Sequence, residues 1–129
     1  MSEGELKKLP PFEFQNWVIR RLFGRVSARK SGDMGIDGYT FEGHPVQVKQ
    51  SPDVGRNVVD NFETALRRAQ KDTGMIVAFS FTRDAIEERA RAENEEKIHI
   101  TLLAVRDLLK ADRDIPYAPS IQDSLQSHL

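Results

Sequence analysis

The chain has 129 residues, of which 39% are hydrophobic and 30% are charged, and its formal net charge is −1. This composition is typical of one globular domain, and we expect a single domain with its core at about residues 9–110 and a tail at 111–129. The absence of cysteine excludes disulfides, zinc–thiolate sites and thiol nucleophiles. No apolar run approaches the roughly 20 residues that cross a bilayer, and the N-terminus is too polar for a signal peptide, so we expect a cytoplasmic protein.

The charge is unevenly distributed along the chain. Residues 1–75 hold 12 Lys and Arg against 10 Asp and Glu, whereas residues 76–129 hold 7 against 10. A surface that binds a polyanion such as nucleic acid would therefore be a local patch in the first half.

The first half of the chain predicts one helix followed by three strands. Prolines at positions 10 and 11 suit the first turn of a helix, apolar residues then follow at helical spacing, and Gly24 ends the run. The strands are expected at residues 25–30, 36–41 and 45–51, with Glu42-Gly43-His44 as the turn between the last two.

The second half predicts alternating helices and strands. An amphipathic helix is expected to end at Gly74, and its Arg67, Arg68 and Lys71 form the solvent-exposed face. The apolar run at 75–79 is typical of a strand covered on both faces. A helix capped by Thr82, a strand at 98–105 and a short helix at 107–110 follow. The order αβββαβαβα predicts an α/β fold, with a central mixed sheet of about five strands flanked by helices.

One strand carries a row of polar side chains. Gln47, Lys49 and Ser51 alternate with valines and so face the other side of the strand. Such alternation is also typical of a half-solvated strand. However, a sheet covered on both faces would need a partner for a buried lysine and carboxamide, and Asp37 lies on the neighbouring strand. A carboxylate, a carboxamide and a lysine on one face suit Mg²⁺-dependent cleavage of a phosphodiester.

The run GDMGIDGYTFEGHPVQVKQS at residues 32–51 resembles the Mrr-like restriction endonucleases, a branch of the PD-(D/E)XK nuclease superfamily. In that branch glutamine often replaces the second acid, which gives the pattern Asp…Gln-x-Lys. The resemblance extends from Phe12-Glu13-Phe14 to LLAVRDLL at 102–109. It implies a restriction-endonuclease-like α/β/α core and a Mg²⁺-dependent DNA endonuclease, with Mn²⁺ able to substitute, in a restriction–modification or DNA-repair system.

Carried over by position, the resemblance makes Asp37 the central metal ligand and Gln47 the neutral replacement for the second acid. The backbone carbonyl of Val48 would complete the metal ligands, and Lys49 would position or activate the attacking water. Glu13 matches the extra acid that many members bring to the metal, with a surface glutamate as the alternative. The neutral Gln47 implies weaker metal affinity than a site with two acids.

The flanking residues are the expected DNA contacts, with ordinary solvated charges as the alternative for the cations. These residues are Arg29, Lys30, Gln50, Ser51 and Arg56. Asp33 is the rival to Asp37 as the catalytic acid. Cutting both strands of a duplex needs two sites, so a homodimer is expected, with a methyltransferase or a DNA-recognition domain as a further partner. The alternatives are a non-catalytic DNA-binding module and a Holliday-junction-resolvase-like nuclease.

The turn between the second and third strands decides whether this site can form. A two-residue turn at Glu42-Gly43 would set Asp37 against Val48 and away from Lys49. A three-residue turn, with His44 as its last residue, would set Asp37 opposite Lys49 and Tyr39 opposite Gln47. The nuclease hypothesis therefore requires the longer turn, or a bulge with the same effect.

Overall fold

The computed structural model describes residues 1–27 and 35–114. The elements are α1 (Glu3–Lys8), α2 (Pro11–Arg21), β1 (Arg25–Val26), β2 (Gly38–Tyr39), β3 (Pro45–Val48), α3 (Arg56–Arg68), β4 (Thr73–Ala78), α4 (Arg83–Arg91), the π-helical turn η1 (Ala92–Glu96), β5 (His99–Ala104) and α5 (Val105–Asp114). From α2 onward this is the predicted order. The helix α1 is additional.

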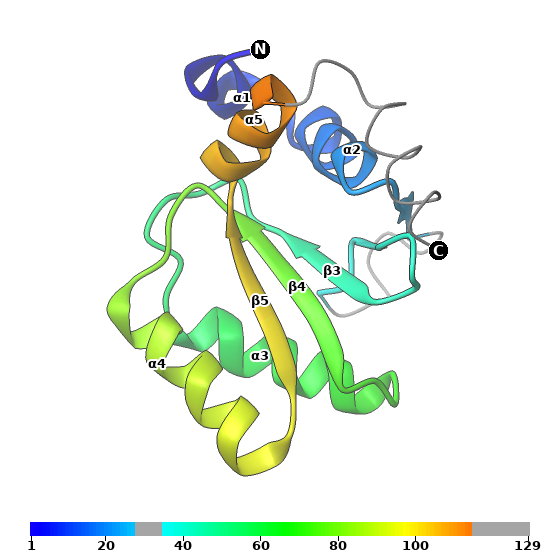
Figure 1. Cartoon of the computed structure of the whole chain (residues 1–129), viewed down its shortest axis with the longest axis vertical. Coiled ribbons are helices and arrows are strands. Elements are labelled where there is room, and N and C mark those ends of the chain that lie inside the picture. The colour runs from blue at the N-terminus through cyan, green and yellow to red at the C-terminus, as the bar shows by residue number, and fades with distance from the viewer. Residues whose placement is uncertain (28–34, 115–129) are drawn as a thin grey trace.

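The five strands form one mixed sheet in the order β1-β2-β3-β4-β5. The first three strands pair antiparallel, whereas β3, β4 and β5 are parallel to one another. In Figure 1 the helices α1, α2 and α5 lie together at one end of the view, and α3 and α4 lie at the other, with the strands between them. The predicted α/β architecture is confirmed.

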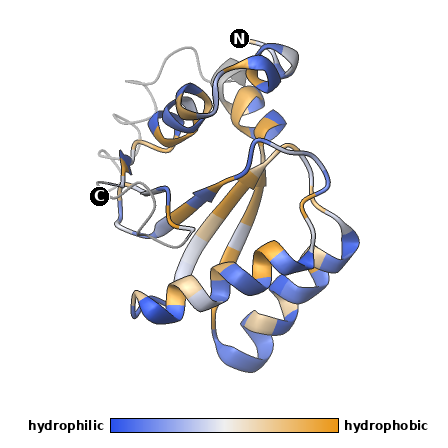
Figure 2. Cartoon of the chain, turned by 180° about the vertical axis from the view of Figure 1, so that it is seen from behind, coloured by the Kyte–Doolittle hydropathy of each residue, from blue (hydrophilic) through white to orange (hydrophobic). Residues whose placement is uncertain are grey.

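Two apolar clusters, one on each side of the sheet, form the core. Ile76 of β4 packs in the cluster that contains the buried side chains of α3, and its neighbour Val77 packs in the cluster of α2. Both side chains are fully buried, so the prediction that this strand is covered on both faces is confirmed. The central strands are accordingly the apolar part of the molecule in Figure 2, and the helices show hydrophilic outer surfaces.

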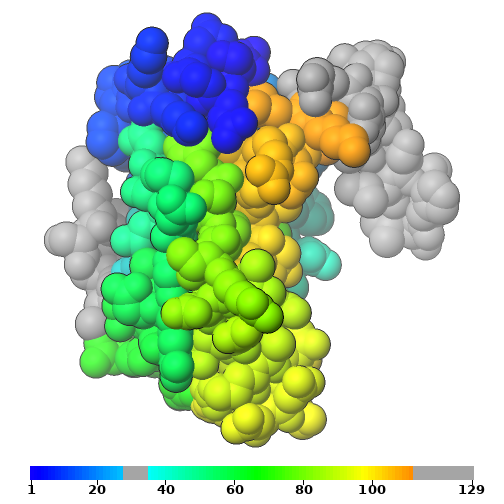
Figure 3. All heavy atoms as spheres, turned by 90° about the vertical axis from the view of Figure 1, so that its left-hand side faces the viewer, coloured from blue at the N-terminus to red at the C-terminus, as the bar shows by residue number. Residues whose placement is uncertain are grey.

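The helix α1 begins with a capping box. The Ser2 side chain accepts a hydrogen bond from the Glu5 backbone N–H, and the Glu5 carboxylate accepts one from the Ser2 N–H. Leu6 buries its side chain completely in the α2 cluster, and α5 lies beside this helix, as the space-filling view shows (Figure 3). The serine and glutamate three residues apart were a signal for this helix in the sequence.

A close contact with α2 makes Gly38 necessary at the start of β2. A Cβ atom there would lie 2.7 Å from the Arg25 carbonyl oxygen and 2.8 Å from Cδ1 of Ile19. The absence of a side chain thus lets β2 lie directly against α2. Gln15 of α2 also donates a hydrogen bond from Nε2 to the Asp37 carbonyl oxygen at 3.1 Å, so α2 holds the backbone of the proposed metal ligand.

Candidate nuclease site at the end of strand β3

The hairpin between β2 and β3 has a three-residue turn, but one residue earlier than predicted. Thr40 N donates to His44 O at 2.9 Å, so the turn comprises residues 41–43, and Gly43 N donates to Thr40 O at 2.9 Å. Gly43 has φ +90° and closes the turn. Three-residue turns place their left-handed residue last, and only glycine adopts that conformation without strain. This preference sets the position of the turn.

The predicted pairings of Asp37 with Lys49 and of Tyr39 with Gln47 are therefore wrong. Tyr39 pairs with Pro45, and Gly38 pairs with Val46. The shift moves each partner by two residues, so Gly38 and Tyr39 keep the faces that the longer turn predicts.

Asp37 lies at an irregular point of the strand pairing. Its N–H donates to Val46 O at 2.8 Å, although Gly38 is the residue paired with Val46. Asp37 and Gly38 thus both lie opposite the single residue Val46, as at a β-bulge. The Oδ2 atom of Asp37 accepts a hydrogen bond from the Val48 N–H at 2.8 Å. The carboxylate consequently lies beside the backbone of β3, at the residue whose carbonyl is a predicted metal ligand.

Gln47 points toward α3 and is 9% exposed. Its Nε2 atom lies against Gly35, where a Cβ atom would come within 3.2 Å, and Gly35 has φ +95°. Its Oε1 atom is buried and has no hydrogen-bond partner in the described part of the protein. A buried carbonyl oxygen without a partner is costly, and a cation would satisfy it.

Lys49 follows Gln47 on the same face. Val46 and Val48 pack in the α2 cluster, so the alternating residues face α3. The Lys49 N–H donates to Val77 O at 2.8 Å, which keeps its backbone in line with the strand, and its side chain is half-buried. Asp37 thus contacts β3 at Val48, the residue between Gln47 and Lys49.

The other predicted site residues are placed differently. Glu13 is exposed in the first turn of α2, and no hydrogen bond or ion pair in the described ranges links it to Asp37. Gln50 donates from Nε2 to Leu6 O at 3.0 Å and to Leu9 O at 2.8 Å, so this nitrogen already has structural partners.

The remaining predicted DNA contacts have no test in the structure. Ser51 is exposed, and Arg56 pairs with Asp60 at 3.5 Å and with Glu88 at 3.6 Å. Arg29, Lys30 and Asp33 lie outside the described residues. DNA contacts by these side chains stay predictions.

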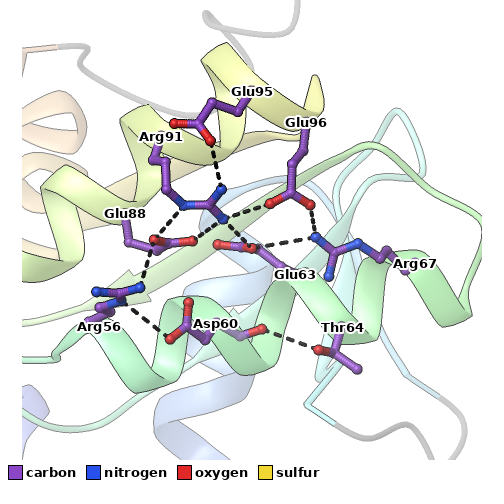
Figure 4. A network of polar contacts seen from close by, with 9 residues as sticks. All are labelled: Arg56, Asp60, Glu63, Thr64, Arg67, Glu88, Arg91, Glu95 and Glu96. Carbon is purple, nitrogen blue, oxygen red and sulfur yellow. Dashed lines mark hydrogen bonds and ion pairs between the residues drawn. The ribbon is translucent and has the colours of Figure 1, made fainter.

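A buried carboxyl pair between α3 and α4 was not predicted from the sequence (Figure 4). Glu63 and Glu88 are each 3% exposed. Arg91 donates to Glu88 at 2.7 Å and lies 3.5 Å from Glu63, and Arg67 lies 3.6 Å from Glu63. The signal in the sequence was the position of both glutamates among the buried residues of amphipathic helices.

The pKa values of the two carboxyls are shifted in opposite directions. Burial, followed by the hydrogen bond and the charge of Glu88, raises the pKa of Glu63 to about 8. The hydrogen bond from Arg91 lowers the pKa of Glu88 to about 2. Glu63 is thus largely protonated at neutral pH, beside an ionised Glu88.

This carboxyl pair is the rival place for a metal ion. Oxygens of Asp60, Glu63 and Glu88 lie within 4.8 Å of one another. Three arginines already contact these oxygens: Arg56, Arg67 and Arg91. These arginines already neutralise the carboxylates, although Oε2 of Glu63 has no hydrogen-bond partner among the described residues. We interpret the cluster as the charged link between α3 and α4.

The comparison with protein families agrees with this fold. A mixed sheet flanked by helices is the architecture expected for a restriction-endonuclease-like domain. The restriction endonuclease family model of the Mrr catalytic type matches residues 6–111, and the chain therefore belongs to that family. The sequence matched none of the curated proteins with which it was compared. Within the described ranges, no helix combines the length and the apolar character that crossing a membrane requires.

Proposed function

We propose that this chain is a Mg²⁺-dependent DNA endonuclease with its reaction centre at Asp37, Gln47, Lys49 and the Val48 carbonyl. The partnerless Oε1 atom of Gln47 carries this proposal. Carboxylate, carboxamide and backbone oxygens are the ligands that Mg²⁺ prefers, and the residues around Gln47 supply one of each. Glu13 is proposed as an additional acid at the metal.

Each side chain has a separate task in the proposed reaction. A bound Mg²⁺, or Mn²⁺ in its place, supplies a Lewis acid for the phosphodiester and its attacking water. Asp37 provides the negative charge of the site, held by the hydrogen bond from Val48 N–H. The Lys49 ammonium orients the water and stabilises the negative charge that builds on the phosphate.

The decisive experiment is cleavage of supercoiled plasmid with Mg²⁺ or Mn²⁺, for the parent and for Lys49→Ala. Lys71→Ala is the matched control, because Lys71 is exposed beyond the end of α3. We expect the parent and the control to cut and Lys49→Ala to be inactive. Equal cutting by Lys49→Ala contradicts the catalytic assignment, and equal cutting in EDTA contradicts the metal dependence.

Two other results would point to the alternative functions. Binding of DNA by the parent without any cutting indicates a non-catalytic DNA-binding module. Cutting of a four-way junction but not of linear duplex indicates a resolvase-like nuclease.

The assembly is part of the proposal. We expect a homodimer on duplex DNA, because a double-strand cut uses two reaction centres. Sedimentation of the protein with and without a duplex measures this directly. A restriction–modification or repair system, with a methyltransferase or DNA-recognition partner, is the proposed setting.

A further inference from the structure

A cavity of about 410 Å³ lies between the start of the hairpin and α3, beside the proposed metal ligand Gln47. Its lining residues are Gly35, Gln47, Asn61, Phe62, Thr64, Ala65 and Arg68. Among the described residues, the lining includes no acidic side chain. This part of the wall is therefore cationic and rich in hydrogen-bonding groups.

The polar wall comes from one stripe of α3. Asn61, Thr64 and Arg68 are spaced i, i+3 and i+7, which places them on one side of a helix, and all three are exposed. Arg67, the neighbour of Arg68, instead pairs with Glu63, which Arg91 of α4 also contacts. The helix thus uses one flank to join α4, as Figure 4 shows, and another to line the cavity.

The chemistry of this stripe is that of a phosphate site. A guanidinium, a hydroxyl and a carboxamide N–H₂ are the side-chain donors that proteins use on phosphate oxygens. The Thr64 hydroxyl donates to the Asp60 carbonyl oxygen at 3.4 Å in the structure and would exchange this bond for one to the phosphate. Because Gln47 forms part of the cavity wall, a phosphodiester bound beside Gln47 would lie next to this stripe.

We propose that Asn61, Thr64 and Arg68 bind a phosphate of the DNA strand beside Gln47, with Arg68 as the positioning residue. The inference rests on the proposed nuclease function and extends it to α3. Since phosphates are the same in every sequence, this contact contributes to affinity and register without selecting a base.

The test measures DNA binding in the Lys49→Ala background, so that cleavage does not interfere. A fluorescein-labelled duplex is titrated with Arg68→Gln and with Arg83→Gln. Arg83→Gln is the control, because it removes the same charge at a side chain of α4 that is 90% exposed. For Arg68→Gln we expect roughly tenfold weaker binding, and a slope of log K against log[salt] that is smaller in magnitude by about 1. Thr64→Val, which keeps the shape of the side chain, should weaken binding by a smaller factor.

Further measurements separate this contact from other effects. Arg68→Lys should retain most of the affinity, because it keeps the positive charge. Arg68→Gln should weaken the binding of two duplexes of unrelated sequence by the same factor. A loss confined to one sequence would indicate a base contact and overturn the proposal. If Arg68→Gln and Arg83→Gln lose the same affinity for the duplex, the loss reflects the change in net charge alone, and the proposal is overturned as well.

The outcomes also distinguish this inference from the function on which it rests. If the parent cuts plasmid while Arg68→Gln binds the duplex normally, only the phosphate site is wrong. If the parent neither cuts nor binds DNA, the proposed function and the phosphate site are both wrong.

Discussion

The carboxylate of Asp37 accepts a hydrogen bond from the backbone N–H of Val48 at 2.8 Å, and this bond joins the proposed metal ligand to the strand of Gln47 and Lys49. Asp37 lies at the bulge, and its side chain contacts the backbone of β3 there. Mutations can therefore distinguish the role of the Asp37 charge from the role of its oxygen as a hydrogen-bond acceptor.

Asp37→Asn should fold like the parent, because an amide oxygen still accepts the hydrogen bond from Val48. Cleavage should fall by roughly 10²-fold or more, since the charge at the metal is lost. Asp37→Ala should lose cleavage equally and also about 1–3 kcal/mol of stability, because the acceptor is removed. Plasmid cleavage and thermal melts measure the two effects. Full activity in Asp37→Asn would show that the charge has no role.

Gln47→Glu should bind Mn²⁺ more tightly than the parent, because a charged oxygen attracts the cation more strongly. Without metal the same variant should melt earlier, since its buried carboxylate has no partner, and Mn²⁺ should raise its Tm more than that of the parent. Gln70→Glu is the control, with the same charge change at an exposed position. Calorimetry that finds identical affinities would place Gln47 away from the metal.

Comparison of Gly35→Ala with Gly43→Ala should distinguish the effect of backbone strain on stability from the role of Gly35 in holding the Gln47 side chain. Both glycines have positive φ, so each alanine should cost about 1–3 kcal/mol of stability. No atom lies within 4 Å of a Cβ at Gly43, whereas a Cβ at Gly35 meets the Gln47 amide at 3.2 Å. Only Gly35→Ala should therefore also weaken Mn²⁺ binding. Equal metal affinity in the two variants would contradict a role for Gly35 in holding Gln47.

The carboxyl pair predicts a pH dependence of stability. Between pH 4.5 and 8 the folded chain keeps the Glu63 proton that the unfolded chain loses, so the free energy of unfolding should fall as pH rises through this range. Glu88 has the opposite effect: its lowered pKa adds stability as pH rises from about 2 to 4.5.

Glu63→Gln imitates the protonated carboxyl and should remove the decline between pH 4.5 and 8. Glu88→Gln should remove the rise at acidic pH and destabilise the protein at neutral pH, because Arg91 loses its charged partner. Urea titrations across this pH range, followed by circular dichroism, measure both variants. A decline that persists unchanged in Glu63→Gln would assign the titration to another group.

The sequence predicted the strand faces and most of the elements, because alternation and helical spacing are local properties. The valines of β3 and the apolar run of β4 lie as these patterns predict. The register of the hairpin was missed because it depended on which turn position Gly43 takes. The pairing of Glu63 with Glu88 depends on which helices meet, and no local pattern contains that information. The same holds for Arg68, whose exposure was predicted but whose place beside Gln47 was not.

The two hydrogen bonds from Gln50 to the carbonyls of Leu6 and Leu9 connect the end of β3 to the first helix of the chain. Short terminal helices open by local unfolding more readily than central strands do. Lys49 immediately precedes Gln50, so an opening of α1 would release the Gln50 side chain next to the proposed catalytic lysine. A helix that contributes none of the reacting groups therefore buttresses the residue next to Lys49, and amide exchange of α1 would report how long this support lasts.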